Sequence, residues 1–286
     1  MAQVAIQPLS ARETDEYVRA CRQFLVGSQT ITQRLLHWRP PPLHPALGGL
    51  PYSDVTVFAS ADSIRLEKLL DETFCHWRNR ERTPKYQFIS LDCQFAHFPH
   101  GQYNALIQLG SRSPPTSFDC VVGQTTWLHS IPPTLKLLLK DDRIIKLTHS
   151  GSNDRASLAK WMSPNGEKLK FSSFIEIDAV ARLFWRLSGD ALANNPNKPS
   201  LSSLAQRFLG ISLADPDGGA GRRWDDPDIQ AKMLRYAVKD SWATMEIFLA
   251  IKYRIDLIAG SEQAGTALVQ QLLVTEMAKD GVVEVL

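Results

Sequence analysis

A short apolar run that carries one aspartate constrains this chain more than any other feature. Five of the ten residues in 86–95 have aromatic, β-branched or aliphatic side chains, the composition of a strand covered on both faces. Such strands occur mainly in α/β proteins, where helices lie on both sides of the sheet. An ionised Asp92 in this strand is costly unless a cation or a hydrogen-bond donor compensates its charge. Asp92 therefore either caps the following turn or belongs to a polar site.

The composition indicates an ordinary globular protein and excludes several other classes. Of the 286 residues, 44% are hydrophobic and 22% are charged, and the net charge of +2 does not by itself indicate nucleic-acid binding. No apolar run is long enough for a transmembrane helix, and the N-terminus lacks the pattern of a signal peptide. The four cysteines form no Cys-x-x-Cys pair, which argues against a zinc ribbon or a disulfide framework. We expect an intracellular protein of the cytoplasm or nucleus without a membrane partner.

The clearest boundary is a linker at residues 39–52, which is rich in proline and contains a Gly-Gly pair. Before it, residues 10–38 begin with a capping-box spacing and place apolar side chains near one face, which predicts a helix. We therefore expect an N-terminal helical extension with its linker (1–52), a main domain (53–258) and a C-terminal helical tail (259–286).

The main domain alternates between β-type and helical patterns, which predicts a mixed α/β architecture. The expected strands are residues 55–58, 86–95, 103–110, 118–122, 143–147 and 174–177. The expected helices are residues 60–77, 128–139, a segment from 154 onward, 200–210 and 234–248. The second, third and fourth strands are close enough in sequence to pair as a meander.

Three further polar residues stand in positions that suit either structure or chemistry. Asp154 follows a strand and a Gly/Ser turn, where it would either cap a helix or lie in a site at the sheet edge. Tyr236 and Asp240 are four residues apart on an apolar helix, so their side chains lie on one face. They form either a buried hydrogen-bonded pair or part of a site.

Taken together, these segments resemble the ribonuclease D branch of the DEDD (DnaQ-like) 3′-5′ exonucleases, the subclass with tyrosine in its last motif (DEDDy). The likeness covers about residues 54–256 and rests on an ordered set of short motifs: Asp92-Cys93-Gln94, 105–109, Lys146 with His149 and Asp154, Ile177-Asp178-Ala179, 201–204 with Leu209-Gly210, Trp224, and 236–240. It implies a ribonuclease H-like α/β fold with a mixed sheet of about five strands flanked by helices.

The resemblance also implies a chemistry. The substrate would be the 3′ end of a single-stranded nucleic acid, RNA rather than DNA, and the cofactors would be two Mg²⁺ or Mn²⁺ ions. Asp92 would bridge both ions, Asp240 would help to hold one, and Asp154 would hold the other. Tyr236 would orient the attacking water. The implied catalytic set is therefore Asp92, Gln94, Asp154, Tyr236 and Asp240.

Gln94 departs from the family pattern, which has glutamate at this position. Side chains two apart on a strand face the same way, so Gln94 still points into the site, but its amide carries no charge. One missing unit charge beside a divalent ion predicts a loss of about tenfold to a hundredfold in metal occupancy or rate. The glutamine is native to a pseudo-nuclease, is a deliberate isosteric substitution, or is compensated by another group, and all three explanations stay open.

Three function classes follow from this sequence. The first is a 3′-5′ exonuclease domain whose activity is weakened or lost through Gln94. The second is a catalytically inactive RNA-binding or scaffold module (a pseudo-exonuclease), in which the helix expected at residues 10–38 offers a surface for a homodimer or another protein. The third is a plain α/β interaction domain whose acids are caps. Metal-dependent shortening of a single strand would favour the first class. Salt-dependent RNA binding without shortening would favour the second.

Overall fold

The computed structural model describes residues 33–38, 54–74, 87–98, 101–113, 117–128, 130–163, 171–213, 224 and 231–279. Its strands are β1 (Gln33–Trp38), β2 (Asp54–Ser60), β3 (Gln87–Phe98), β4 (Gly101–Ser113), β5 (Ser117–Gly123), β6 (Ile144–Thr148) and β7 (Phe174–Glu176). Its α-helices are α2 (Ser63–Phe74), α3 (Pro133–Lys140), α4 (Ser152–Met162), α5 (Ile177–Ser188), α6 (Leu201–Phe208), α7 (Ala231–Ala259) and α8 (Glu262–Lys279). Two short 3-10 helices are η3 (Thr125–Trp127) and η4 (Ala191–Asn194).

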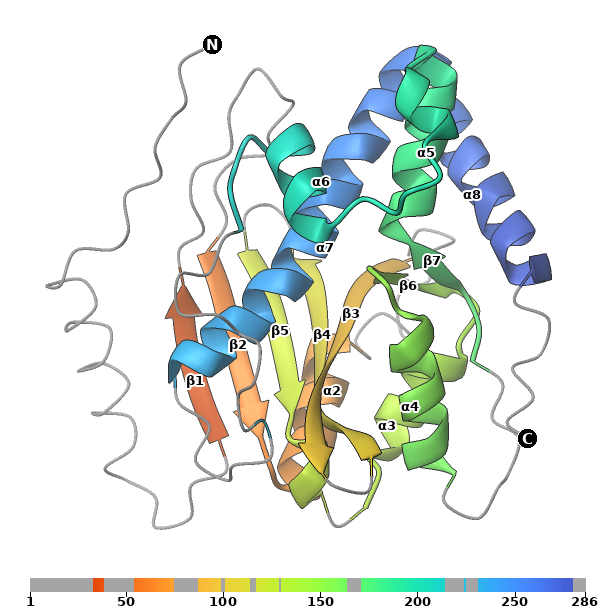
Figure 1. Cartoon of the computed structure of the whole chain (residues 1–286). Coiled ribbons are helices and arrows are strands. Elements are labelled where there is room, and N and C mark those ends of the chain that lie inside the picture. Colours follow the sequence, from red (N-terminus) through yellow and green to blue (C-terminus); the bar gives the residue numbers. More distant parts are fainter. Residues whose placement is uncertain are drawn as a thin grey trace, which may run out of the picture.

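A mixed sheet forms the centre of the fold (Figure 1). Within the described residues it has seven strands in the order β1-β2-β5-β4-β3-β6-β7. β3, β4 and β5 form the predicted antiparallel meander, whereas β6 runs parallel to both β3 and β7, and β2 runs parallel to β5. This arrangement confirms the α/β prediction. The six β-type segments expected from the sequence correspond to β2 to β7, and β1 is one more strand, whereas the family resemblance implied about five.

The additional strand corrects the prediction of a helix over residues 10–38. Residues 33–38 form β1, which pairs antiparallel with β2 along its whole length, from Gln33 opposite Ser60 to Trp38 opposite Val55. Pairing with a neighbouring strand overrides the helical spacing of this segment. The helix that was expected to offer a dimer or partner surface therefore does not include residues 33–38. Residues 10–32 lie outside the described residues. The division at residue 52 stays a prediction.

A second difference concerns the helix predicted for residues 128–139. The observed helix α3 begins only at Pro133. Proline is favoured in the first turn of a helix because it has no backbone N–H to donate, and it disfavours helical geometry in the residue before it. Pro132 and Pro133 therefore set the start of α3, and the described residues 128 and 130–132 lie outside it.

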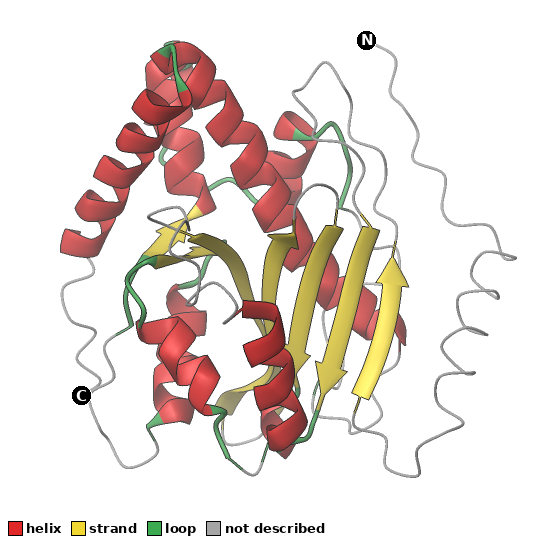
Figure 2. Ribbon diagram, turned by 180° about the vertical axis from the view of Figure 1, so that it is seen from behind, coloured by secondary structure: helices red, strands yellow, loops and turns green. Residues whose placement is uncertain are grey.

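Helices cover both faces of the sheet. The long helix α7 crosses one face, and α5, α6 and α8 share a hydrophobic core with it on that side (Figure 1). The opposite face, seen from behind in Figure 2, is covered by α2, α3 and α4, which bury leucines and Phe74 against β3, β4 and β5. None of the helices in the described ranges is both long and apolar enough to cross a lipid bilayer.

Candidate active site

Asp92 lies on β3 beside the turn that connects β6 to α4. The parallel pairing of β3 with β6 ends with Ser90 opposite Leu147. Because Asp92 is two residues further along β3, it lies level with the chain that leaves β6. That chain enters α4 at Ser152, so the sheet register alone brings the first turn of α4 next to Asp92.

Asp154 occupies the first turn of α4 and is buried, with 5% of its surface exposed. The residue at the N-cap position is Gly151, and no side chain caps this end of the helix from that position. The alternative that Asp154 is the N-cap is therefore wrong. A buried carboxylate without that role needs another reason to stay at this position.

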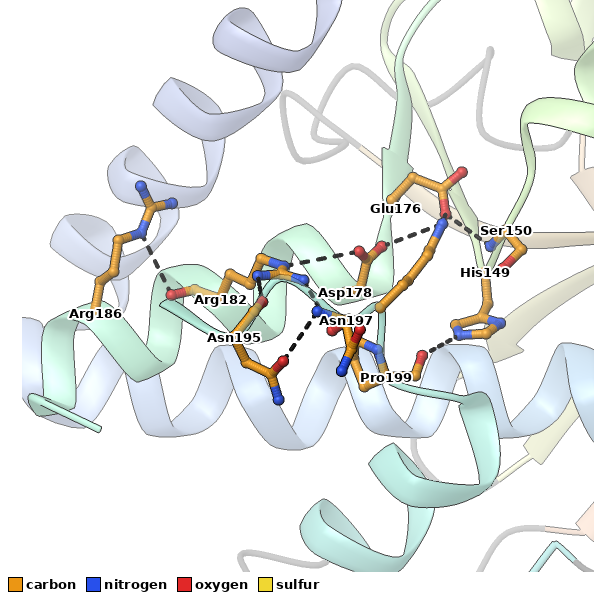
Figure 3. Close-up of polar contacts among 10 residues, drawn as sticks. His149, Ser150, Glu176, Asp178, Arg182, Arg186, Asn195, Asn197 and Pro199 are labelled. Carbon is orange, nitrogen blue, oxygen red and sulfur yellow. Dashed lines mark hydrogen bonds and ion pairs between the residues drawn. The ribbon is translucent and has the colours of Figure 1, made fainter. Parts of the chain in front are cut away.

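Glu176, at the end of β7, fixes the turn that presents Asp154. Its carboxylate accepts a hydrogen bond from the backbone N–H of Ser150 at 2.8 Å (Figure 3). It accepts another from the backbone N–H of Gly151 at 2.8 Å and forms an ion pair with Lys198 at 3.0 Å. Ser150 has a φ of 59°, a left-handed conformation that a non-glycine residue adopts only when contacts hold it there. Glu176 therefore both braces the turn and places a negative charge near Asp154.

The same network joins α5 to the loop before α6 (Figure 3). Arg182 donates to the carbonyl oxygens of Asn195 and Asn197, and Lys198 lies 3.6 Å from Asp178. His149, one of the motif residues, contacts the carbonyl oxygen of Pro199 through Nε2 at 2.9 Å. These contacts assign His149 a supporting role for the loop that borders the site.

Helix α7 brings Asp240 to the sheet through close packing at the next residue. Ser241 Oγ lies 2.8 Å from Ser90 Oγ, two residues before Asp92 on β3. The approach depends on Gly110 of β4, because a Cβ atom there would lie 2.1 Å from Phe118, 2.4 Å from Ser90 Oγ and 2.8 Å from Ser241 Oγ. A glycine at this position therefore sets how near Asp240 lies to Asp92.

Gly110→Ala is expected to lower the free energy of unfolding by about 1–3 kcal/mol, because the added methyl group must push α7 or the Phe118 ring away. Urea unfolding measures the loss. The double variant with Phe118→Leu lacks the nearest ring atom, so its loss should be smaller than the sum of the two single losses. Equal stability of Gly110→Ala and the native chain would contradict the close packing of α7.

Asp154 and Asp240 both act electrostatically on Asp92. Asp92 keeps part of its surface exposed, yet burial raises its pKa well above the ordinary value, and the charges of Asp154 and Asp240 raise it further. Burial likewise raises the pKa of Asp154 to about 7, with a further increase from Glu176 that Arg155 partly offsets. The fold thus places Asp154 of α4 and Asp240 of α7 near enough to Asp92 of β3 to influence its protonation.

Asp154→Asn is expected to stabilise the metal-free protein at pH 8. The folded-state pKa of about 7 lies above the unfolded value, so stability falls as pH rises through this window, and the amide removes this effect. The upper limit of the gain is about 4 kcal/mol, from a shift of about 3 pKa units. Urea unfolding in chelator at pH 4 and pH 8 measures it, with the exposed Asp142→Asn as control. An equal difference at both pH values would contradict the burial of this charge.

Two amides meet the Asp92 carboxylate. Gln94 Nε2 donates to Oδ2 of Asp92 at 2.7 Å. With the Gln108 amide turned so that its nitrogen faces Asp92, the orientation that satisfies both of its polar atoms, it donates to the same Oδ2 at 2.8 Å and to the backbone oxygen at 3.1 Å. The sequence motif contained Gln108, but only the pairing of β3 with β4 shows that it faces Asp92.

Tyr236 lies one helical turn before Asp240, partly exposed, with its ring 6.0 Å from that of Trp224. Lys239 lies 5.3 Å above the Tyr236 ring and donates to the carbonyl oxygen of Leu213 at 2.9 Å. Lys146, by contrast, is fully buried in β6 and points its ammonium group to backbone oxygens at the start of that strand. The structure therefore gives Lys146 a role in the core, away from the acids.

Comparison with known families identifies the family of this chain. A family model described as 3′-5′ exonuclease matches residues 81–256, more than half of the chain. The chain belongs to this 3′-5′ exonuclease family. The matched range contains every residue of the predicted catalytic set. No curated protein sequence matches the chain.

Solved structures show the fold of this exonuclease domain. Escherichia coli RNase D, an exoribonuclease involved in structured RNA processing, is 16% identical with a TM-score of 0.51, over 75% of this chain and 49% of that chain. The present chain thus spans about half the length of RNase D. The Aedes aegypti Nibbler EXO domain is 17% identical with a TM-score of 0.55, over 74% and 93% of the two chains. Brucella melitensis NrnC with bound Mg²⁺ is 17% identical with a TM-score of 0.45, over 71% and 90%. The fold is the ribonuclease H-like exonuclease fold.

The three carboxylates of this exonuclease domain are of the right chemical type for a divalent cation, but they are not grouped as closely as a bound cation requires. Carboxylate oxygens are the ligands that Mg²⁺ and Mn²⁺ prefer, and the mutual repulsion of Asp92, Asp154 and Asp240 is what a cation would relieve. Yet among the described residues no three His, Cys, Asp or Glu side chains are grouped closely enough to hold a metal ion. The donor set therefore fits a cation only if the Asp92 carboxylate or its neighbours adjust.

Proposed function

We propose that this domain removes nucleotides from the 3′ end of a single-stranded nucleic acid, RNA rather than DNA, by metal-assisted phosphodiester hydrolysis. We further propose that Gln94 weakens this activity. The observation that carries the proposal is that Asp154 and Asp240, from two distant segments, both lie near enough to Asp92 to raise the pKa of its carboxyl group. Asp154 is buried, and Asp92 and Asp240 are partly exposed, so a ligand that offsets their negative charge would remove a cost to the stability of the fold.

In the proposed mechanism, Asp92, Asp154 and Asp240 would hold two Mg²⁺ or Mn²⁺ ions. When bound, such ions acidify the attacking water and stabilise the charge on the leaving 3′ oxygen. Tyr236 shares a helix face with Asp240 and would accept or donate a hydrogen bond to the attacking water. Gln94 supplies a neutral amide where a fourth carboxylate would add negative charge, so the cations would be held less tightly.

A primer-shortening assay tests this proposal. A 5′-labelled single-stranded RNA incubated with Mn²⁺ should yield a ladder of products shortened from the 3′ end, slowly for the native chain. Asp240→Ala should abolish the ladder, whereas Asp71→Ala, which removes an exposed acid of α2, should leave it unchanged. A DNA of the same sequence tests the preference for RNA. The absence of shortening by both the native chain and Gln94→Glu would contradict the proposal.

One observation favours a second candidate, the inactive RNA-binding module. The Gln94 amide donates to Asp92, so the acid that would bridge the metal ions already has a hydrogen-bond partner. In that case RNA would bind to the domain with an affinity that falls steeply with salt, and neither the native chain nor Gln94→Glu would shorten it. Binding measured by fluorescence anisotropy at several salt concentrations separates this candidate from the enzyme.

A further inference from the structure

The amides of Gln94 and Gln108 converge on one oxygen of Asp92. The distances to Oδ2 are 2.7 Å from Gln94 and 2.8 Å from Gln108 in the orientation that satisfies its amide. Hydrogen bonds from neutral donors to a carboxylate are stronger than those between neutral groups. Two such bonds occupy the lone pairs that this oxygen would otherwise offer to a cation.

The sheet itself creates this convergence. Asp92 and Gln108 are direct partners in the pairing of β3 with β4, so their side chains leave the same face next to each other. Gln94 follows Asp92 by two residues and shares that face, immediately before the irregularity in the β3–β4 register at Phe95. Gln108 is fully buried, with 0% of its surface exposed, so its amide needs a partner inside the protein, and Asp92 is that partner.

We propose that Gln94 and Gln108 form a clamp that stands in for a cation at Asp92, and that metal binding must displace the Gln94 amide. This inference rests on the proposed function, because it concerns the same metal-binding acids. It assigns Gln108 as a positioning residue, which holds Asp92 in both states. In this inference Gln94 is not a weak metal ligand, because its amide competes with the metal for Oδ2 of Asp92.

The clamp can be tested without any metal. In chelator, Gln94→Ala and Gln108→Leu should each lower the melting temperature by about 3–10 °C, because each removes a hydrogen bond to a charged group. In an Asp92→Ala background, the same changes should cost little, since the acceptor is gone. Gln87→Ala, at the other end of β3, is the matched control and should behave alike in both backgrounds. Equal costs in both backgrounds would overturn the clamp.

The second arm measures Mn²⁺ affinity by calorimetry. If the Gln94 amide competes with the metal, Gln94→Ala should bind Mn²⁺ about tenfold more tightly than the native chain, despite its lower melting temperature. If the Gln94 carbonyl oxygen were a ligand, Gln94→Ala would bind more weakly, and that result would overturn the inference.

These experiments distinguish a failure of the clamp from a failure of the proposed function. Gln94→Glu both removes the donor and adds a charge, so it should bind Mn²⁺ more tightly than either the native chain or Gln94→Ala. It should also melt at a lower temperature in chelator, because a fourth carboxylate adds repulsion. If no variant binds Mn²⁺, including Gln94→Glu, the proposed function is wrong, while the metal-free comparison of Asp92 backgrounds still decides whether the clamp exists.

Discussion

Gln94→Glu is expected to increase Mn²⁺-dependent removal of 3′ nucleotides by about tenfold to a hundredfold. The glutamate restores a negative charge beside Asp92 on the same face of β3, and it withdraws the amide that now donates to the Asp92 carboxylate. Both changes favour a cation at this position. The measurement is the initial rate of shortening of a 5′-labelled RNA under single-turnover conditions.

The control for this prediction places the same charge elsewhere on the strand. Gln87→Glu adds a carboxylate at the start of β3, where the chain pairs with Ile144, and should leave the rate unchanged. A dependence of the Gln94→Glu rate on Asp154 and Asp240 would show that the new activity uses the three acids. A rate equal to that of the native chain would mean that Gln94 does not limit catalysis.

The second large effect concerns a buried ion pair between the sheet and α7. Arg112 of β4 donates from Nη1 to both carboxylate oxygens of Glu246, at 3.2 and 3.3 Å, and only 2% of Glu246 is exposed. Arg112→Met should lower the free energy of unfolding by about 3–5 kcal/mol, because it leaves a buried carboxylate without its partner. This loss corresponds to a melting temperature lower by about 6–20 °C.

The pH dependence of this loss identifies its cause. Burial raises the pKa of Glu246 and Arg112 counteracts that increase, so removing Arg112 leaves the pKa further above its unfolded value. The raised pKa means that the ionised carboxylate is unfavourable in the folded protein. The loss of stability in Arg112→Met should therefore shrink below about pH 4, where glutamate is protonated in both the folded and the unfolded state. The double variant Arg112→Met with Glu246→Leu should recover most of the stability. A loss that is equal at pH 4 and pH 7 would contradict a charge effect.

Patterns that are local in sequence predicted most of the fold. The antiparallel meander follows from three β-type runs separated by short connections, and the helix carrying Tyr236 and Asp240 follows from an extended apolar period. β1 could not be predicted in this way. Its six residues lie far from the meander in sequence and become a strand by pairing with β2, a contact between segments that no local pattern contains.

The candidate site divides in the same way. Sequence motifs alone allowed four residues to be proposed as members of the site, because each stands in a short motif and the motifs follow one another in the order of a known family. These residues are Asp92, Asp154, Tyr236 and Asp240. Their roles stay predictions. The contacts of Gln108 depend on which β4 residue faces Asp92, and one residue of slip in that pairing would turn the amide to the opposite face.

Glu176 shows a second limit of sequence reasoning. Its carboxylate accepts hydrogen bonds from the turn before α4, although 25 residues separate it from Gly151. The parallel pairing of β6 with β7 brings them together, with Thr148 opposite Glu176. A glutamate at a strand end gave no signal of this role, because the partner lies in another segment. The support of the Asp154 turn therefore became visible only in the folded chain.

The central claim is that Asp92, Asp154 and Asp240 together bind divalent metal ions. Crystals of the native chain and of Gln94→Glu soaked in Mn²⁺ test it most directly through anomalous difference maps. We expect two strong peaks between the three carboxylates in Gln94→Glu and weaker density there in the native chain. Maps without a peak among these acids in either crystal would contradict it.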